Sequence, residues 1–69
     1  MPLLLSVRGK RNVIRRIGGP EDVKKRLETL GFTVGGEVTV MSELAGDLIV
    51  KVKDSRIALG RELANRIFV

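Results

Sequence analysis

The chain of 69 residues contains no cysteine and no histidine, and its only aromatic residues are Phe32 and Phe68. It therefore has no disulfide, no thiolate nucleophile, no histidine base and no histidine-bound transition metal. A chain this short buries only about 60% of the surface that its unfolded form exposes. We expect the core to be built from aliphatic side chains, and the function to be binding and not catalysis.

Long hydrophobic runs are also missing. The longest uncharged apolar run, Met1–Val7, is far shorter than the ~20 residues that cross a bilayer. It also lacks the basic start and the longer apolar segment of a signal peptide. We therefore expect a soluble, cytoplasmic protein.

The formal charge of +5 is distributed unevenly. Residues 1–26 carry eight lysines and arginines against two acids, whereas residues 27–69 carry five against six. A basic half is typical of a protein with an anionic partner, which includes nucleic acid, lipid head groups and an acidic protein face. A basic surface also keeps a small protein soluble, so charge alone leaves both interpretations open.

No repeat or linker divides the chain, and residues 1–69 are predicted to form one domain. Asn12–Ile17 is rich in β-branched residues and predicts a strand, but its imperfect alternation indicates a bulge or a strong bend. Further strands are expected over 37–40, 48–53, 56–59 and 66–69, with a hairpin loop at 45–47, a turn at 54–55 and a 3₁₀ turn over 61–65. In strand 48–53, alternation places Leu48, Val50 and Val52 inward.

One helix interrupts these strands. Pro20 suits the first helical position, and an apolar stripe at i, i+4, i+7 follows. Gly31 is placed to end the helix in a left-handed conformation, with Phe32 folding back onto Leu27. Five short strands with one inserted helix predict a small antiparallel barrel, because closing the sheet hides strand edges.

Three groups of residues are candidate sites. Gly18-Gly19-Pro20 beside Arg15 and Arg16 either holds an anion or is simply a tight turn before a helix. The acidic residues of the loops show no metal-binding pattern and are not one of these groups. The basic set of the first half fits a nucleic-acid backbone, although the absence of Tyr and Trp argues against stacking on bases. The third group, which is either an exposed apolar patch or part of the core, consists of Leu44, Ile49 and Phe68.

The sequence resembles the FeoA family over nearly its whole length. Ser55–Leu59, within Leu48–Val69, carries the most specific part of this resemblance. The matching features upstream are Gly9, Val13–Gly19, Leu27–Phe32, Gly35, Val38 and Val40. The resemblance implies an SH3-like barrel, mainly β with one inserted helix. It also implies a non-enzymatic protein that works beside FeoB, the membrane ferrous-iron transporter with a cytoplasmic G domain.

Our leading hypothesis is therefore an adaptor of ferrous-iron uptake that binds the transporter's cytoplasmic part and has no catalytic, cofactor or metal site. The connection before Leu48 is shorter than in many members of the family. The sequence leaves open whether the protein forms a homo-oligomer. The residues predicted to bind the partner are Arg15, Arg16, Leu44, Ile49, Ser55, Arg56 and Arg61.

Two alternatives belong to other classes of protein. A nucleic-acid-binding barrel would show an affinity that falls with log salt, by about 0.9 per phosphate contact on duplex DNA. A detached regulatory domain of the kind found in iron-dependent repressors would need a DNA-binding region upstream.

Overall fold

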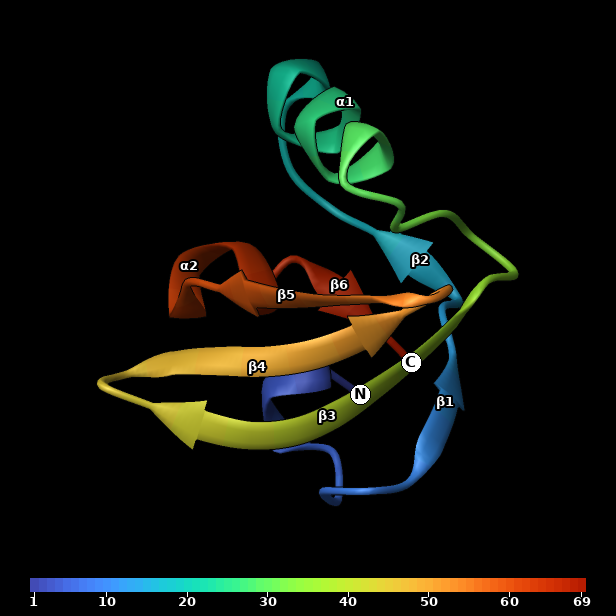
Figure 1. Ribbon diagram of the computed structural model, residues 1–69. Coiled ribbons are helices and arrows are strands. Elements are labelled where there is room, and N and C mark those ends of the chain that lie inside the picture. The colour runs from blue at the N-terminus through green and yellow to red at the C-terminus, as the bar shows by residue number, and fades with distance from the viewer.

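The computed structural model describes residues 1–69 and is mainly β, with six strands, two α-helices and one short 3₁₀ helix (Figure 1). The elements in chain order are η1 (Leu3–Leu5), β1 (Arg11–Val13), β2 (Arg16–Ile17), α1 (Glu21–Thr29), β3 (Glu37–Leu44), β4 (Asp47–Val52), β5 (Ser55–Leu59), α2 (Arg61–Ala64) and β6 (Ile67–Phe68).

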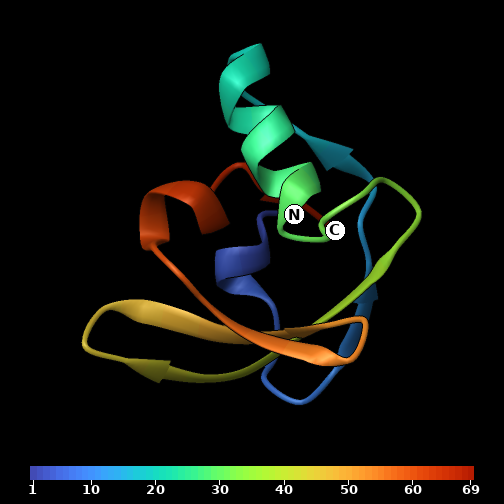
Figure 2. The ribbon, with the colours of Figure 1, turned by 45° about the horizontal axis from the view of Figure 1, so that its top comes forward.

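The strands form two antiparallel sheets. One has the order β1-β3-β4-β5 and the other pairs β2 with β6. The two ends of the chain also pair, because the Val69 N–H donates to the Met1 carbonyl at 2.8 Å and Pro2 bridges to Phe68. Figure 2 shows the termini close together. The result is the small barrel that the sequence predicts.

The predicted strand Asn12–Ile17 is divided between the two sheets. Ile14 is buried and its N–H donates to the Gly36 carbonyl at 2.9 Å, whereas the next N–H, that of Arg15, donates to the Phe68 carbonyl at 2.8 Å. The chain therefore leaves β3 and joins β6 within one residue. This confirms the strong bend that the imperfect alternation indicates.

Helix α1 ends as predicted and begins one residue later than predicted. Pro20 has an extended ψ of 160° and is the N-cap, not the first helical residue. At the other end, Gly31 has φ +104°. The Phe32 N–H donates to Leu27 O and the Gly31 N–H to Glu28 O, both at 2.9 Å. These two bonds form a Schellman motif, which points the Phe32 side chain into the core.

Two short loops set the register of the four-stranded sheet. Ala45 and Gly46 both have positive φ (52° and 87°), as a two-residue hairpin with the right-handed twist of its strands requires. Asp47 is already paired with Leu44, so the loop is shorter than predicted. Between β4 and β5, the turn consists of residues 53–54, one residue earlier than predicted, because Ser55 already pairs with Val52.

The segment after β5 is an α-helix and not the predicted 3₁₀ turn. The Ala64 N–H donates to Gly60 O and the Asn65 N–H to Arg61 O, both at 2.9 Å and both over four residues. Ala64 is fully buried and Leu63 half-buried, while the first two residues of α2 are exposed. The inward and outward faces are therefore as predicted.

The core holds twelve buried residues, of which Phe32 is the only aromatic one. Val38 and Val40 of β3 lie opposite Val52 and Val50 of β4, and all four are buried. The inward positions predicted for β4 are confirmed. Because strand side chains alternate, the residues between them lie on the other side of the sheet, away from the core. No helix has the length and apolar character to cross a membrane.

Candidate partner-binding surface

The side of the four-stranded sheet that faces away from the core is uncovered, and we call it the outer face. Figure 1 looks onto it, and neither helix crosses in front of the sheet. One row of the outer face runs directly across all four strands, from Arg11 through Thr39 and Lys51 to Arg56. The outer face consists of Arg11, Val13, Glu37, Thr39, Ser42, Leu44, Asp47, Ile49, Lys51, Arg56 and Ala58.

The basic end of the outer face is hollowed. A shallow depression of about 430 Å³ lies there, lined by Arg11, Glu37, Thr39, Lys51 and Lys53. Adjacent strands lie about 4.8 Å apart, so the row from Arg11 to Arg56 spans roughly 14 Å. These three cations lie side by side across the strands, so the basic end of the outer face attracts the anionic groups of a ligand.

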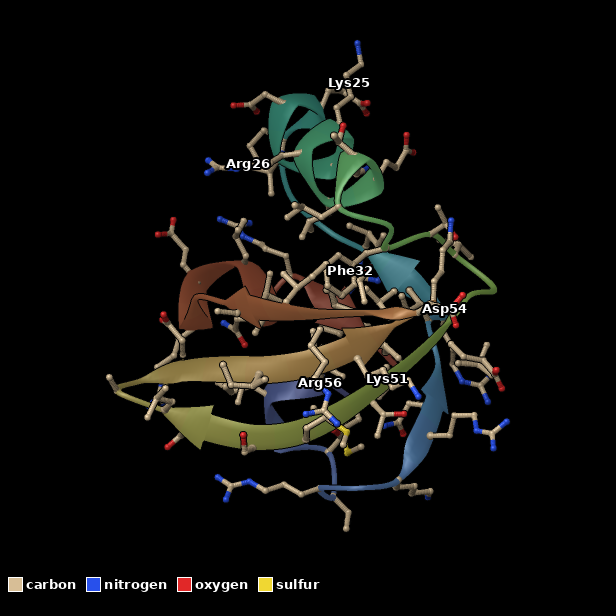
Figure 3. All side chains as sticks on the ribbon, in the orientation of Figure 1. Lys25, Arg26, Phe32, Lys51, Asp54 and Arg56 are labelled. Atoms are coloured by element: carbon tan, nitrogen blue, oxygen red, sulfur yellow. The ribbon has the colours of Figure 1, made fainter.

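The cations of this row are mostly unpaired within the chain. Arg11 lies 3.6 Å from Glu37, and both side chains are largely exposed. Lys51 and Arg56 have no carboxylate within ion-pair distance and form no side-chain hydrogen bond. They nevertheless lie directly opposite each other across β4 and β5, and Figure 3 shows both on the side toward the viewer. Like charges in that position destabilise a sheet.

The other end of the outer face carries exposed aliphatic side chains, together with Ser42 and Asp47. The register shifts by one residue between Val40 and Ser42, which places Ser42 opposite Ile49. Ala58 lies opposite Ile49 on the other side. Leu44, at the end of the hairpin, is 69% exposed. The outer face therefore changes from cationic to aliphatic along the strands.

Of the residues predicted to bind a partner, the structure brings three onto this face, namely Leu44, Ile49 and Arg56. Ser55 is exposed at the start of β5, next to Arg56 in sequence but opposite the inward Val52.

The other three predicted residues lie elsewhere. Arg15 and Arg16 are exposed at β2, on the second sheet, and Arg61 is the exposed first residue of α2. Phe68 does not join Leu44 in an apolar patch, because it is half-buried on β6 with the Arg16 guanidinium 4.3 Å from its ring centroid. A second shallow depression, of about 360 Å³, lies beside this contact and the Gly18–Gly19 turn.

Sequence reasoning did not select Lys51. The signal was present, because the alternation that places Val50 and Val52 inward also places Lys51 outward. Alternation alone does not show that Lys51 lies opposite Arg56, because this pairing depends on the position of the turn between the two strands.

The structure brings together no group of three acidic side chains that would hold a metal ion. The outer face offers cations, a hydroxyl, aliphatic groups and the carboxylates of Glu37 and Asp47, and these groups are suited to recognition. The Thr39 hydroxyl forms no hydrogen bond inside the chain and is free to donate to a ligand.

Residues 1–69 match the family model of the FeoA domain. The chain belongs to the FeoA family. A relative from Methanocaldococcus jannaschii, which carries the name of an Fe(2+) transport protein A, is 31% identical over 68 residues, covering 99% of this chain and 83% of its own length. FeoA proteins are transport-associated accessory proteins, and the resemblance predicted from the sequence is confirmed.

Solved structures confirm the SH3-like fold. The zinc complex of Stenotrophomonas maltophilia FeoA, described as an SH3 domain protein, has a TM-score of 0.83 and 26% identity, over 99% of this chain and 87% of that one. A manganese-dependent transcriptional repressor has a TM-score of 0.85 at 20% identity, over 97% of this chain and 39% of the repressor. At that identity the likeness to the repressor concerns the fold alone.

Proposed function

We propose that this FeoA protein is a non-catalytic accessory factor of Fe²⁺ uptake that binds the cytoplasmic G domain of a FeoB-like transporter. The observation that carries the proposal is the outer face. The chain is a member of a transport-associated family. Its outer face presents unpaired Lys51 and Arg56 beside exposed aliphatic side chains and holds no reactive group. Such a face is suited to holding another protein.

The relatives support the iron-transport part of the proposal. The Methanocaldococcus protein is named for Fe(2+) transport, and the Stenotrophomonas FeoA is described as a candidate ferrous iron transport activating factor. We propose the same process for this chain. Its place of action is then the cytoplasm, at the inner side of the membrane through its partner.

Three of the predicted arginines, Arg15, Arg56 and Arg61, have a further proposed role at the G domain. Arg15, directly before β2, and Arg61, the first residue of α2, lie off the outer face, are exposed and form no ion pair, so they are free to approach an acidic surface of the G domain. An arginine supplied in trans stabilises the charge on a transferring phosphate in other GTPases. If charge-neutral changes at Arg15, Arg56 and Arg61 together leave stimulated GTP hydrolysis intact, that role is excluded.

Nucleic acid is the weaker candidate. Single-strand binding relies on aromatic stacking platforms. Phe32 is fully buried, and Phe68 is half-buried with a guanidinium over its ring. The exposed aliphatic end of the outer face also has no counterpart in a phosphate backbone.

A pull-down with the transporter's cytoplasmic domain tests the proposal. Immobilised full-length protein should retain the domain in its GDP or its GTP-analogue state, and retention should fall as salt rises from 50 to about 500 mM because exposed charges are screened. Helix variant Lys25→Glu, on α1, serves as a control that keeps binding. Absence of retention in both nucleotide states at low salt would overturn the proposal.

A further inference from the structure

We infer that the outer face binds an extended acidic and aliphatic segment of the partner protein, with carboxylates over Lys51 and Arg56 and aliphatic side chains over Ile49 and Leu44. This inference rests on the proposed function and adds the chemistry of the partner and its orientation. The segment runs along the strands, from the basic end of the outer face to its apolar end.

The first argument is the cost of the Lys51–Arg56 pair. The two side chains are exposed, lie directly opposite each other and have no acid within ion-pair distance. Such a pair opposes folding of the isolated chain. A local arrangement that costs stability without compensation inside the fold is typical of a binding site, where the ligand supplies the compensation.

The second argument is the continuity of the basic row. Thr39 separates Arg11 from Lys51, and its hydroxyl has no partner in the chain. Three cations and one free donor therefore point out of the same side of four strands. Carboxylates accept hydrogen bonds from all of these groups, and the guanidinium fork of an arginine binds them through two parallel bonds.

The third argument is the aliphatic end of the face. Leu44 is 69% exposed and Ile49 is half-buried, with only Ser42 and Ala58 directly beside Ile49. Covering these side chains releases water and contributes roughly equally at low and high salt. A segment that is acidic throughout would leave this end uncovered, so the partner segment is aliphatic there.

The same features argue against a second copy of this chain as the occupant. The outer face carries three cations and two carboxylates, of which Glu37 is already paired with Arg11 and Asp47 lies opposite Leu44. Two copies joined face to face would bring six cations together with only two carboxylates that are not already paired, the two copies of Asp47, and this leaves charge uncompensated.

Glu37 supplies a test of the basic row at its Arg11 end. It lies 3.6 Å from Arg11 in the depression and competes with an incoming carboxylate for that guanidinium. Exposed ion pairs of this kind are weak, so a ligand displaces Glu37 readily. Glu37→Gln should therefore raise affinity for an acidic segment about threefold, because one competing charge is removed.

The experiment uses the full chain and fluorescence anisotropy. The probes are the transporter's cytoplasmic domain and a labelled synthetic 12-residue peptide with four Glu followed by alternating Leu and Ser. The double variant Lys51→Glu/Arg56→Glu should weaken binding of both probes by about 30-fold, because two attractions become repulsions. The matched control Lys25→Glu/Arg26→Glu changes net charge equally on α1, away from the outer face in Figure 3, and should change affinity less than threefold.

A further variant tests the aliphatic end of the surface. Leu44→Ser should weaken peptide binding about fivefold at low and at high salt alike, since its contribution is apolar burial. A circular dichroism spectrum that matches the parent protein's establishes that each variant is folded. Equal losses of affinity from the outer-face and α1 double variants would overturn the inference. So would tighter binding of a single-stranded oligonucleotide than of the peptide. A dimer of the parent protein in analytical ultracentrifugation that becomes a monomer in the Leu44→Ser variant would also overturn it.

The outcomes separate this inference from the proposed function. If the transporter domain binds the parent chain and binds the outer-face double variant equally well, the function stands and the inference fails. If the peptide binds as expected and the transporter domain binds nothing, the chemistry of the outer face stands and the proposed partner is wrong.

Discussion

Replacing Phe32 with alanine should leave the protein largely unfolded at 25 °C. Phe32 is the only buried aromatic residue and is fully inaccessible. It sits directly after Gly31, where the Schellman motif turns the chain from α1 back into the barrel, and Figure 3 shows it between α1 and the sheet. Truncating a buried phenylalanine costs about 3–5 kcal/mol. The core of a chain this short rarely supplies more than about 3–5 kcal/mol of stability, so this loss removes most of it.

Urea unfolding followed by far-ultraviolet circular dichroism measures this effect. Val34→Ala, two residues further on and 64% exposed, is the control and should change the free energy of unfolding by less than about 0.5 kcal/mol. A Phe32→Ala protein that loses less than about 1 kcal/mol would contradict the placement of this ring in the core.

Two neighbouring positions in β4 should respond oppositely to the same substitution. Val50→Asp should abolish folding at neutral pH, because Val50 is fully buried between Val40 and Ile57 and a carboxylate there has no basic partner. Lys51→Asp should fold normally and gain slightly in stability, because it replaces a like-charge pair with Arg56 by an attractive one.

The same unfolding measurement on both variants checks the register of the sheet. A one-residue slip in a strand moves every side chain to the other face. A folded Val50→Asp protein together with an unfolded Lys51→Asp protein would therefore show that the outer face is assigned to the wrong side of β4.

Much of the fold follows from local sequence signals. Alternation identifies the inward residues of β4, and Gly31 followed by Phe32 identifies the end of α1. These signals are strong because each depends on a few neighbouring residues. The split of Asn12–Ile17 between two sheets is different, since its partners Gly36 and Phe68 lie far away along the chain.

The candidate site was less accessible to sequence reasoning for the same reason. A turn at 54–55 would place Lys53 opposite Arg56, whereas the observed turn at 53–54 places Lys51 there. One residue in a loop therefore decides which cations meet. Likewise, Arg15 and Arg16 are close to Arg11 in sequence, but the bend at Ile14 places them on the second sheet.

A titration of the ¹⁵N-labelled full-length protein with the transporter's cytoplasmic domain, followed by amide chemical shifts, tests the central claim most directly. We expect saturable shifts at Thr39, Ile49, Lys51 and Arg56, with the amides of α1 around Lys25 unchanged. Shifts confined to α1, or spectra that stay unchanged at saturating concentrations of the domain, would contradict the account.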